Sequence, residues 1–354
     1  MIQENIVKES DLWLNEKSAM QHVVVSSRAR LARNIPRIPF ATHATPEELI
    51  RITRAIDRVI SGNPGLNAFH PISLHEAPQL IRRYLKESHI ISSEMEKGEQ
   101  HRVIYVSPDF HISIMVNEED HIRIQGLTAG MKIGDILGEI LKIDDLLTEK
   151  LPVAFSDQYG YLTACPSNLG TGLRVSVMLH LPGLVMTNNI EKIIKMIQPH
   201  GLTVRGFYGE NSEFDGDFYQ ISNELSLGKS EGEIVSLLVD VIKNIIHQEG
   251  KAREELFSRQ VIMTEDSIWR SFAILSQARL IDTQEAMKLL SHIRLGIDRG
   301  YFSFLDHNLL NKLVIEIQPA HLEYLRTDQR GSEARDMARA TLLRNYFNMP
   351  GSKN

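Results

Sequence analysis

The sequence of 354 residues contains a single cysteine, Cys165, which excludes a disulfide within one chain. A lone thiol suits a reducing compartment such as the cytoplasm. No apolar run approaches the roughly 20 residues that a membrane-spanning helix needs. The first residues, MIQENIVKESDLW, include early acidic residues and lack the apolar core of a signal peptide. We therefore expect a soluble cytoplasmic protein with no direct role at a membrane.

The chain also lacks an excess of positively charged residues. The formal net charge is −6 at pH 7, and the isoelectric point is about 6.2. The sequence therefore has no general basic surface that would bind nucleic acid directly. It contains neither a GxxxxGKS/T phosphate loop nor a protein-kinase glycine loop with an HRD motif. If the chain binds ATP, we expect guanidinium side chains to hold the phosphates.

Short strand-like segments alternate with helices over the first two thirds of the chain, and helical periodicity alone follows. Strands are predicted over residues 22–27, 102–106, 112–116, 121–125, 161–164, 174–179, 202–208 and 218–222. Helices are predicted from a capping box at Thr45 and Glu48, and over residues 133–147, 190–197, 231–248, 264–280, 282–295, 306–317 and 332–346. The polar turn at residues 117–120 joins two strands, which favours an antiparallel hairpin.

These patterns predict an α+β fold, with an antiparallel sheet flanked by helices, followed by an all-α C-terminal domain. We expect a lead-in over residues 1–21, a catalytic domain over 22–250 and the helical domain over 251–354. The charged segment 250–255 marks the expected boundary, because strand signals stop there.

Residues 161–175, YLTACPSNLGTGLRV, form a glycine-rich loop between two predicted strands. Glycine lets the backbone turn sharply and approach a ligand closely. Hydroxyl, amide and guanidinium groups in the same loop can bind phosphate. A thiol among such donors, here Cys165, is expected to have a lowered pKa. From the loop alone, a simple turn with a buried, inert cysteine is the better interpretation, and the other motifs of the chain are what favour a binding site.

Arginines gather at or near the ends of predicted strands: Arg28, Arg30, Arg123, Arg174 and Arg205. A single arginine is usually a solvated surface residue, but an unpaired charge inside an apolar strand is costly. Several converging guanidiniums favour a polyanion such as a nucleoside triphosphate, because each planar fork binds phosphate oxygens in pairs. Acidic residues at 118–120 and 210 lie beside two of these arginines. Acid-rich turns are usually solvated loops, but next to an anion site they can hold Mg²⁺ or a cationic acceptor.

Four segments resemble the signatures of the phosphagen kinases, the family of arginine and creatine kinases. They are SSRARLARN at residues 26–34, NEEDHIR at 117–123, CPSNLGTGLR at 165–174 and RGFYGE at 205–210. The resemblance covers about residues 22–250 and implies a glutamine-synthetase-like catalytic domain. The stretch ARDMARA at 334–340 is similar to the RDxxRA pattern of the bacterial branch that phosphorylates arginine side chains in proteins.

The resemblance implies a role for each matching residue. Glu119 binds the acceptor guanidinium and accepts its proton, Glu210 holds its other side, and Cys165 adds an anionic contact. The implied ATP contacts come from Ser27, Arg28, Ala29, Arg30, Leu31, His89, Arg123, Arg174, Val175, Ser176, Val177, Met178, Arg205, Gly206, Phe207, Tyr208, Gly209 and Glu210. Mg²⁺ accompanies ATP, and no metal site is built by the chain itself.

A second site is implied in the helical domain. Arg335, Asp336 and Arg339 fall at i, i+1 and i+4 of a predicted helix, which from spacing alone describes an ordinary charged helix face. The resemblance favours instead a pocket for phosphoarginine, with arginine on the phosphate and aspartate on the guanidinium. Such a pocket allows feedback on the kinase.

Two departures from the phosphagen kinases stand out. Only about twenty residues precede the first motif, where those enzymes carry a large helical domain, so we expect a more open acceptor site that admits a protein side chain. Gln220 stands where the small-substrate enzymes have aspartate, which puts one nucleotide contact in doubt.

The sequence therefore predicts an ATP-dependent kinase that transfers the γ-phosphate to arginine side chains in proteins. Two alternatives stay open: a kinase of free arginine, and a non-catalytic adaptor that binds phosphoarginine. The resemblance further implies a homodimer, a zinc-binding activator of the McsA type, regulation of stress-response repressors, and marking of proteins for degradation by a Clp ATPase and protease.

Overall fold

An eight-stranded, fully antiparallel sheet forms the centre of the computed structural model, which describes residues 13, 20–207, 215–325 and 331–348. The strands, in spatial order, are β2 (His70–Ser73), β3 (Val103–Val106), β4 (Ile112–Val116), β5 (Ile122–Ala129), β1 (Val24–Arg33), β8 (Leu173–His180), β10 (Phe218–Asn223) and β9 (Leu202–Arg205). The predicted antiparallel sheet is confirmed, and the hairpin of β4 and β5 turns at residues 117–120.

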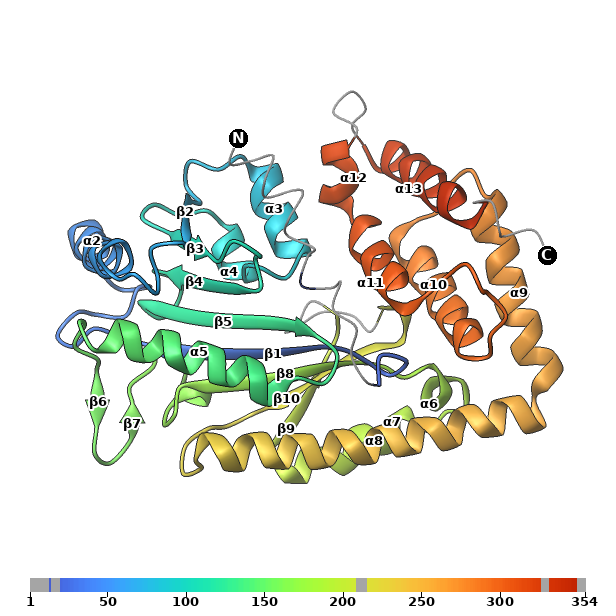
Figure 1. Ribbon diagram of the computed structural model, residues 1–354, viewed down its shortest axis with the longest axis horizontal. Helices are drawn as coiled ribbons and strands as arrows, with labels where there is room; N and C mark the ends of the chain where they lie inside the picture. The colour runs from blue at the N-terminus through green and yellow to red at the C-terminus, as the bar shows by residue number, and fades with distance from the viewer. Residues whose placement is uncertain (1–12, 14–19, 208–214, 326–330, 349–354) are drawn as a thin grey trace.

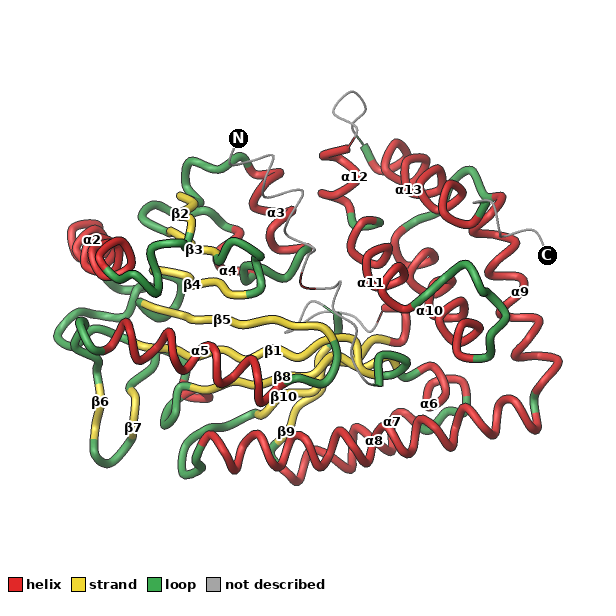
Figure 2. Tube along the Cα trace, in the orientation of Figure 1, coloured by secondary structure: helices red, strands yellow, loops and turns green. Residues whose placement is uncertain are grey.

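Helices cover one face of this sheet (Figures 1 and 2). They are α2 (Pro46–Gly62), α5 (Ile133–Thr148), α6 (Pro182–Met186), α7 (Ile190–Ile197) and α8 (Glu231–Arg259). Alternate strand residues such as Ala29, Leu31, Val175 and Val177 pack with them in one apolar core. This alternation follows from the period of two in a strand, and it sends the neighbouring residues to the opposite face.

The opposite face of the sheet is shared by two groups of helices. One group is α3 (Gln79–Glu87) with the short α4 (Ser93–Glu96). The other is the helical domain, α9 (Val261–Gln277), α10 (Thr283–Asp298), α11 (His307–Glu316), α12 (Pro319–Leu325) and α13 (Ser332–Phe347), at the right of Figure 1. A second apolar core contains Leu127, Met178 and Phe218 of the sheet together with residues of both groups. The predicted all-α region is thus confirmed, and it packs directly on the sheet.

The expected domain boundary at residues 250–255 lies inside α8. The helix continues because Ala252 and Leu256 extend its buried stripe beyond Ile245. The boundary therefore stays a prediction, with no break in the backbone to mark it.

The strand predicted over residues 161–164 is wrong for most of its length. Only Gly160–Tyr161 pairs, as β7, with β6 (Phe155–Ser156). After Tyr161 the Leu162 N–H makes a further backbone bond to the Ala154 carbonyl, and the chain then contacts side chains: Asn34 Nδ2 donates to the Leu162 carbonyl and the Ala164 N–H donates to Asp120.

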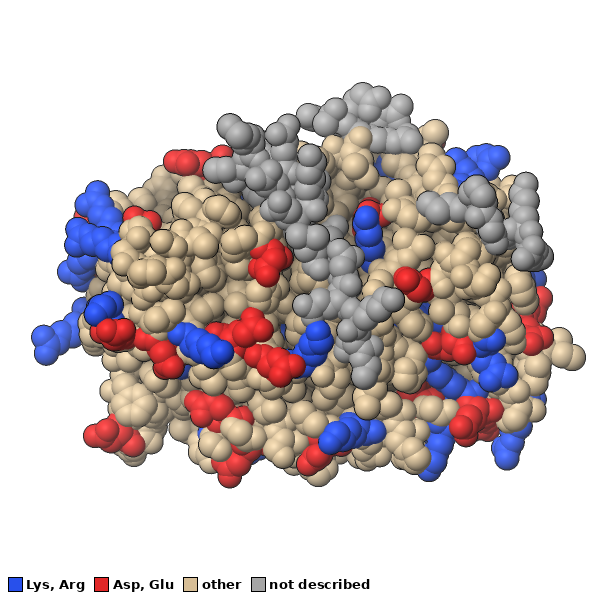
Figure 3. All heavy atoms as spheres, viewed as in Figure 1, with Lys and Arg blue, Asp and Glu red and all other residues tan. Residues whose placement is uncertain are grey.

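Charge on the surface is mixed. On the face shown in Figure 3, basic and acidic side chains are interspersed along α5 and α8. No helix in the described ranges is both long and apolar enough to cross a membrane.

Candidate active site

The register of the central strands brings the predicted arginines together. Arg30 of β1 lies directly opposite Arg174 of β8. On its other side Arg30 faces Gln125 of β5, and Arg123 lies two residues along the same strand. Like charges directly opposite each other destabilise a sheet. A fold that retains this arrangement points to a bound anion that compensates it.

Burial makes this cluster still more unusual. It lowers the pKa of Arg28 to about 10, with further lowering by Arg205, Arg123 and Arg174. The pKa of Arg30 is also well below its ordinary value, first because of burial and then because of Arg28. Among the described residues no carboxylate pairs with Arg28 or Arg30, and their buried Nε atoms have no hydrogen-bond partner. These groups are positioned to bind phosphate oxygens.

One cavity on this face joins all four sequence motifs. Its lining includes Arg28, Arg30, Glu118, Glu119, Arg123, Cys165, Ser167, Asn168, Arg174 and Arg205, and the segment after α3 with His89, Ser92 and Glu94. Residues separated by more than a hundred positions in sequence thus face one space. The arrangement places guanidiniums and carboxylates side by side, as transfer of a phosphoryl group to a cation requires.

The two glutamates of the hairpin have different environments. Glu118 is buried, forms an ion pair of 2.5 Å with Arg123 and accepts a hydrogen bond from the Ser92 hydroxyl. Glu119 is nearly half exposed, and its Oε2 lies 3.4 Å from Arg123 Nη2. Burial raises the pKa of Glu119, and this outweighs the opposing effect of Arg123. A carboxylate with a raised pKa that faces the cavity is suited to accept a proton.

Glu118 is a functional candidate that sequence reasoning assigned no role. The only signal was its place within the acidic motif, which does not distinguish a buried ion-pair partner from its neighbour. Ser92 and Glu94 were missed too, because the region between residues 75 and 100 has no regular apolar period.

Cys165 lies at the start of a 3₁₀ turn, Pro166–Asn168, on the wall of the cavity. Its Sγ is 3.0 Å from the Ser167 hydroxyl, which accepts a hydrogen bond of 3.2 Å from Arg174 Nη2. The buried carboxylate of Asp120, next to Glu119, accepts a hydrogen bond of 2.6 Å from the Ala164 N–H. The hairpin and the cysteine loop are therefore fixed to each other by a direct contact.

Gly172 needs to be glycine at this place. Its φ is +70°, and a Cβ there would lie 2.5 Å from Arg33 Nη1. That guanidinium donates to the Thr171 carbonyl at 3.0 Å and pairs with Asp144 of α5 at 2.6 Å. The loop is thus held closely against the end of β1, immediately before Arg174.

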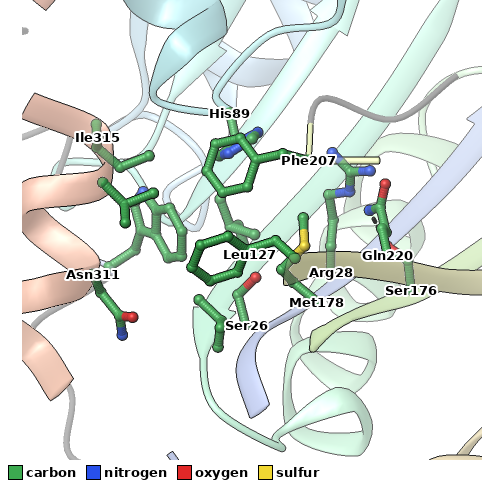
Figure 4. A pocket seen from close by; sticks show the side chains of 14 residues that line it. Ser26, Arg28, His89, Leu127, Ser176, Met178, Phe207, Gln220, Asn311 and Ile315 are labelled. Atoms are coloured by element: carbon green, nitrogen blue, oxygen red, sulfur yellow. Dashed lines mark hydrogen bonds between the residues drawn. The ribbon is translucent and has the colours of Figure 1, made fainter. Parts of the chain in front are cut away.

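A second, largely apolar hollow continues from Arg28 and His89 toward the helical domain. Figure 4 shows Arg28 and Gln220 at one end of it, and Asn311 and Ile315 of α11 at the other. Gln220 Nε2 donates to the Ser176 hydroxyl at 2.9 Å. Burial, followed by Arg28, lowers the pKa of His89 to about 3, so this ring is neutral at physiological pH. An apolar space beside a phosphate site is suited to a nucleoside.

The predicted nucleotide residues divide between the two faces of the strands. Arg28, Arg30, Arg123, Arg174, Arg205, His89, Ser176, Met178 and Phe207 line one of the two hollows. The side chains of Ala29, Leu31, Val175 and Val177 belong to the core on the opposite face, and Ser27 Oγ donates to the Gly130 carbonyl at 2.7 Å. Any nucleotide contact from these five residues must come from their backbone. Gly206 is buried at the end of β9, whereas Tyr208, Gly209 and Glu210 lie outside the described residues.

The three residues predicted to bind phosphoarginine lie on α13, apart from the catalytic cavity. Arg335 Nη1 pairs with Glu323 of α12 at 2.8 Å. Arg339 is buried, where its Nε donates to the Ile317 carbonyl and its Nη1 to the Ile281 carbonyl and to Asp336. Arg335 and Asp336 are each about 30% exposed (29% and 30%), so they can face a ligand, whereas Arg339 is committed to the interior.

Known proteins place these features in context. Residues 51–252 match the family model described as the ATP:guanido phosphotransferase C-terminal catalytic domain. Residues 261–354 match the model described as the protein-arginine kinase McsB C-terminal domain. Together the two models cover both regions of the fold.

Curated relatives match along nearly the whole chain. A protein-arginine kinase of Halothermothrix orenii is 41% identical over 348 residues, which is 98% of this chain and 99% of the relative. One of Bacillus mycoides is 42% identical over 334 residues, or 94% of each chain.

Solved structures of guanidino kinases share the fold. The duplicated taurocyamine kinase of Schistosoma mansoni, with bound transition-state-analogue components, gives a TM-score of 0.60 at 26% identity, over 67% of this chain and 34% of that one. A lombricine kinase gives 0.58 at 28% identity, over 65% and 67%.

Proposed function

The chain belongs to the ATP:guanido phosphotransferase family and, within it, to the protein-arginine kinases, and from this we propose that it transfers the γ-phosphate of ATP to arginine side chains of proteins. The observation that carries the proposal is the cluster of guanidiniums that shares one cavity with Glu119, in which Arg28 and Arg30 have no carboxylate partner among the described residues. The two charges that the reaction must hold, an anionic phosphoryl chain and a cationic acceptor, have matching partners there.

ATP is held by side chains in this proposal. Arg28, Arg30, Arg123, Arg174 and Arg205 bind the phosphates and neutralise the charge that develops as the γ-phosphoryl group moves. The nucleoside extends past His89 into the apolar hollow, where Ser176 and Met178 line the wall. Among the described residues no group of three acidic, histidine or cysteine side chains could hold a metal by itself. Mg²⁺ would arrive with ATP and neutralise its phosphates, and the carboxylates of Glu94 and Glu118 line the same cavity.

The acceptor is held by carboxylates. A guanidinium is protonated at neutral pH and is a poor nucleophile until it loses a proton. Glu119 accepts that proton as the N–P bond forms and the bond between the γ-phosphorus and the bridging oxygen of ADP breaks. Cys165 gives a further contact at the reacting nitrogen, and Glu210 is assigned by its motif to the other side of the guanidinium.

A labelling experiment tests the proposal. The protein is incubated with MgATP and an unfolded polypeptide, and the product is analysed by mass spectrometry without acid, which hydrolyses the N–P bond. We expect phosphate on arginine. A parallel reaction with free arginine separates the first alternative: fast turnover of the free amino acid with none on the polypeptide would refute the proposal. Binding of phosphoarginine without any transfer would favour the adaptor alternative.

The family resemblance supports the remaining parts of the proposal: a cytoplasmic homodimer, a zinc-binding activator, and delivery of phosphorylated proteins, stress-response repressors among them, to a Clp protease. Light scattering of the purified protein measures the oligomer. Degradation of a phosphorylated and an unphosphorylated substrate by a Clp protease, compared side by side, tests the marking role. We also propose that Arg335 and Asp336 bind phosphoarginine in the helical domain, with Arg339 holding Asp336 from the interior.

A further inference from the structure

A buried contact joins the catalytic domain to the helical domain beside the nucleotide site. Glu87, the last residue of α3, is only 8% exposed. Its carboxylate accepts hydrogen bonds from the N–H groups of Ala320 at 2.8 Å and His321 at 3.3 Å, in the first turn of α12. A carboxylate is favourable at this end of a helix because the first N–H groups have no partner within the helix. These hydrogen bonds join α3 to α12, which lie more than 230 residues apart in the sequence.

The side chain of His321 makes further contacts with the end of α3. Its Nδ1 lies 3.1 Å from Glu87, and its Nε2 lies 3.2 Å from the Ser88 hydroxyl. The ring also stacks on Tyr84 of α3, with 3.7 Å between the centroids. The last turn of α3 therefore contacts this one histidine through its two ring nitrogens and one ring face.

The residue that follows this turn is His89, which lines both the phosphate cavity and the apolar hollow. Its φ is +61°, a left-handed conformation that is strained for a residue other than glycine. Such a conformation persists only where the surroundings fix it. Gln125 of β5 holds it from the sheet side, since its Nε2 donates to the His89 carbonyl at 2.9 Å. From the helical side, Glu87 and Ser88 are fixed by α12.

We propose that Glu87 and His321 are positioning residues for ATP, acting through His89. The inference rests on the proposed function, in which His89 contacts the nucleotide. In this proposal the helical domain contributes to ATP binding, because α12 fixes the backbone from which the His89 side chain projects. Figure 4 is consistent with this, because His89 faces a hollow whose far wall is α11 of the same domain.

A second contact at the same junction provides a matched control. Arg83, on α3, pairs with Glu323 of α12 at 3.0 Å, with 30% and 21% of the two side chains exposed. This ion pair also joins α3 to α12, but it lies one turn before Glu87 and is partly solvated. Exposed pairs of this kind contribute little to stability.

The test uses the full-length protein. Glu87→Gln and Arg83→Gln are compared with the unchanged chain for kcat and for the KM of MgATP, with a saturating polypeptide acceptor. In Glu87→Gln, an amide NH₂ replaces one of the oxygens that face the N–H groups of α12. We expect its KM for MgATP to rise about tenfold, with kcat changed less than threefold, and Arg83→Gln to match the unchanged chain. A purely structural role would reduce the folded fraction, which lowers apparent kcat without moving KM.

Two further variants keep the outcome clear. His321→Ala retains the hydrogen bond from Ala320 to Glu87, and it replaces Glu87→Gln in the test if that variant fails to fold. We expect a smaller rise in the KM for MgATP. An unchanged KM in the folded variants overturns the inference. His89→Ala separates the inference from its premise. If His89→Ala leaves the KM for MgATP unchanged, the proposed nucleotide contact fails; if it raises KM and Glu87→Gln does not, only the positioning role fails.

Discussion

Arginines that are withdrawn from solvent differ in their partners between the sheet and the helices of this molecule. In the sheet, Arg28 and Arg30 are half-buried, their Nε atoms are buried, and neither has a carboxylate partner among the described residues. In the helices, Arg253 of α8 pairs with Glu249 at 2.5 Å and with Asp298, and Arg339 of α13 donates to two carbonyls and Asp336. Both arrangements withdraw guanidinium atoms from solvent, but only the second pairs them with acceptors within the described chain.

The difference separates charge that serves folding from charge that serves a ligand. Removing one partner from a buried pair leaves the other charge uncompensated, which costs several kcal/mol. Removing a charge that has no partner carries no such penalty. Even within β1 the contrast holds, because Arg33, three residues after Arg30, pairs with Asp144 at 2.6 Å and lies outside the phosphate cluster. Lack of a carboxylate partner therefore distinguishes Arg28 and Arg30 from Arg33, Arg253 and Arg339, whereas Arg123 lines the same cavity while paired with Glu118.

The largest expected effect comes from an unpartnered arginine. Arg30→Met should lower kcat about 10³-fold or more, because a guanidinium on the transferring phosphoryl group contributes on that scale. Its free energy of unfolding should stay the same or increase, since an uncompensated buried charge is lost. Steady-state kinetics and urea denaturation of the same preparation measure both. A large loss of stability would mean that Arg30 has a structural partner, and the contrast would fail.

Glu119 tests the acidic side of the same cavity. Glu119→Gln should lower kcat by about 10²- to 10⁴-fold through loss of the base. Glu119 must be deprotonated to accept a proton, so activity should fall as pH drops through its pKa. Because that pKa is raised, the fall should begin at a higher pH than the ordinary value of about 4.3.

The pH–rate profile of the unchanged chain shows this acidic limb, and residual activity of Glu119→Gln should lack it. Glu149→Gln, an exposed residue just after α5, is the matched control and should keep the full profile. An acidic limb that survives in Glu119→Gln would assign the base to another group.

Arg253 tests the paired class. Arg253→Met leaves the fully buried Glu249 without its cation, although the N–H groups of Gly183 and Leu184 still bind it. We expect the free energy of unfolding to fall by about 3–5 kcal/mol. Arg259→Met, on the same helix, removes an exposed pair with Glu255 and should change it by less than about 1 kcal/mol. Equal effects from the two variants would show that burial of the pair is unimportant.

The sequence could predict the sheet and much of its site for a physical reason. Alternation along β1 and β8 fixes which residues share a face, so Arg28, Arg30 and Arg174 follow from pattern and motif. The sequence could not predict the contact between α3 and α12 on the other side of the site. Glu87 lies more than 230 residues before Ala320 and His321 of α12, and α3 has only nine residues with mixed polarity. No local periodicity in the sequence predicts a contact between two such distant segments. Nor could the sequence show that α8 continues through the predicted boundary at residues 250–255, because the charged segment there keeps the helical spacing of buried residues.

Arg335 gives the smallest expected effect, because it lies between the two classes. It is 29% exposed, and its partner Glu323 is shared with Arg83 of α3. A phosphoryl group that binds Arg335 must compete with this carboxylate, which makes the arginine exchangeable rather than fixed. Arg335→Ala should weaken phosphoarginine binding about tenfold to a hundredfold, the contribution of one or two charge-assisted hydrogen bonds. Titration calorimetry measures it, with Arg335→Lys to separate charge from the planar fork. Binding of ADP should keep its affinity in both variants. If Arg335→Ala binds phosphoarginine as tightly as the unchanged chain, Arg335 belongs with the structural arginines, and the second pocket must be sought elsewhere on the helical domain.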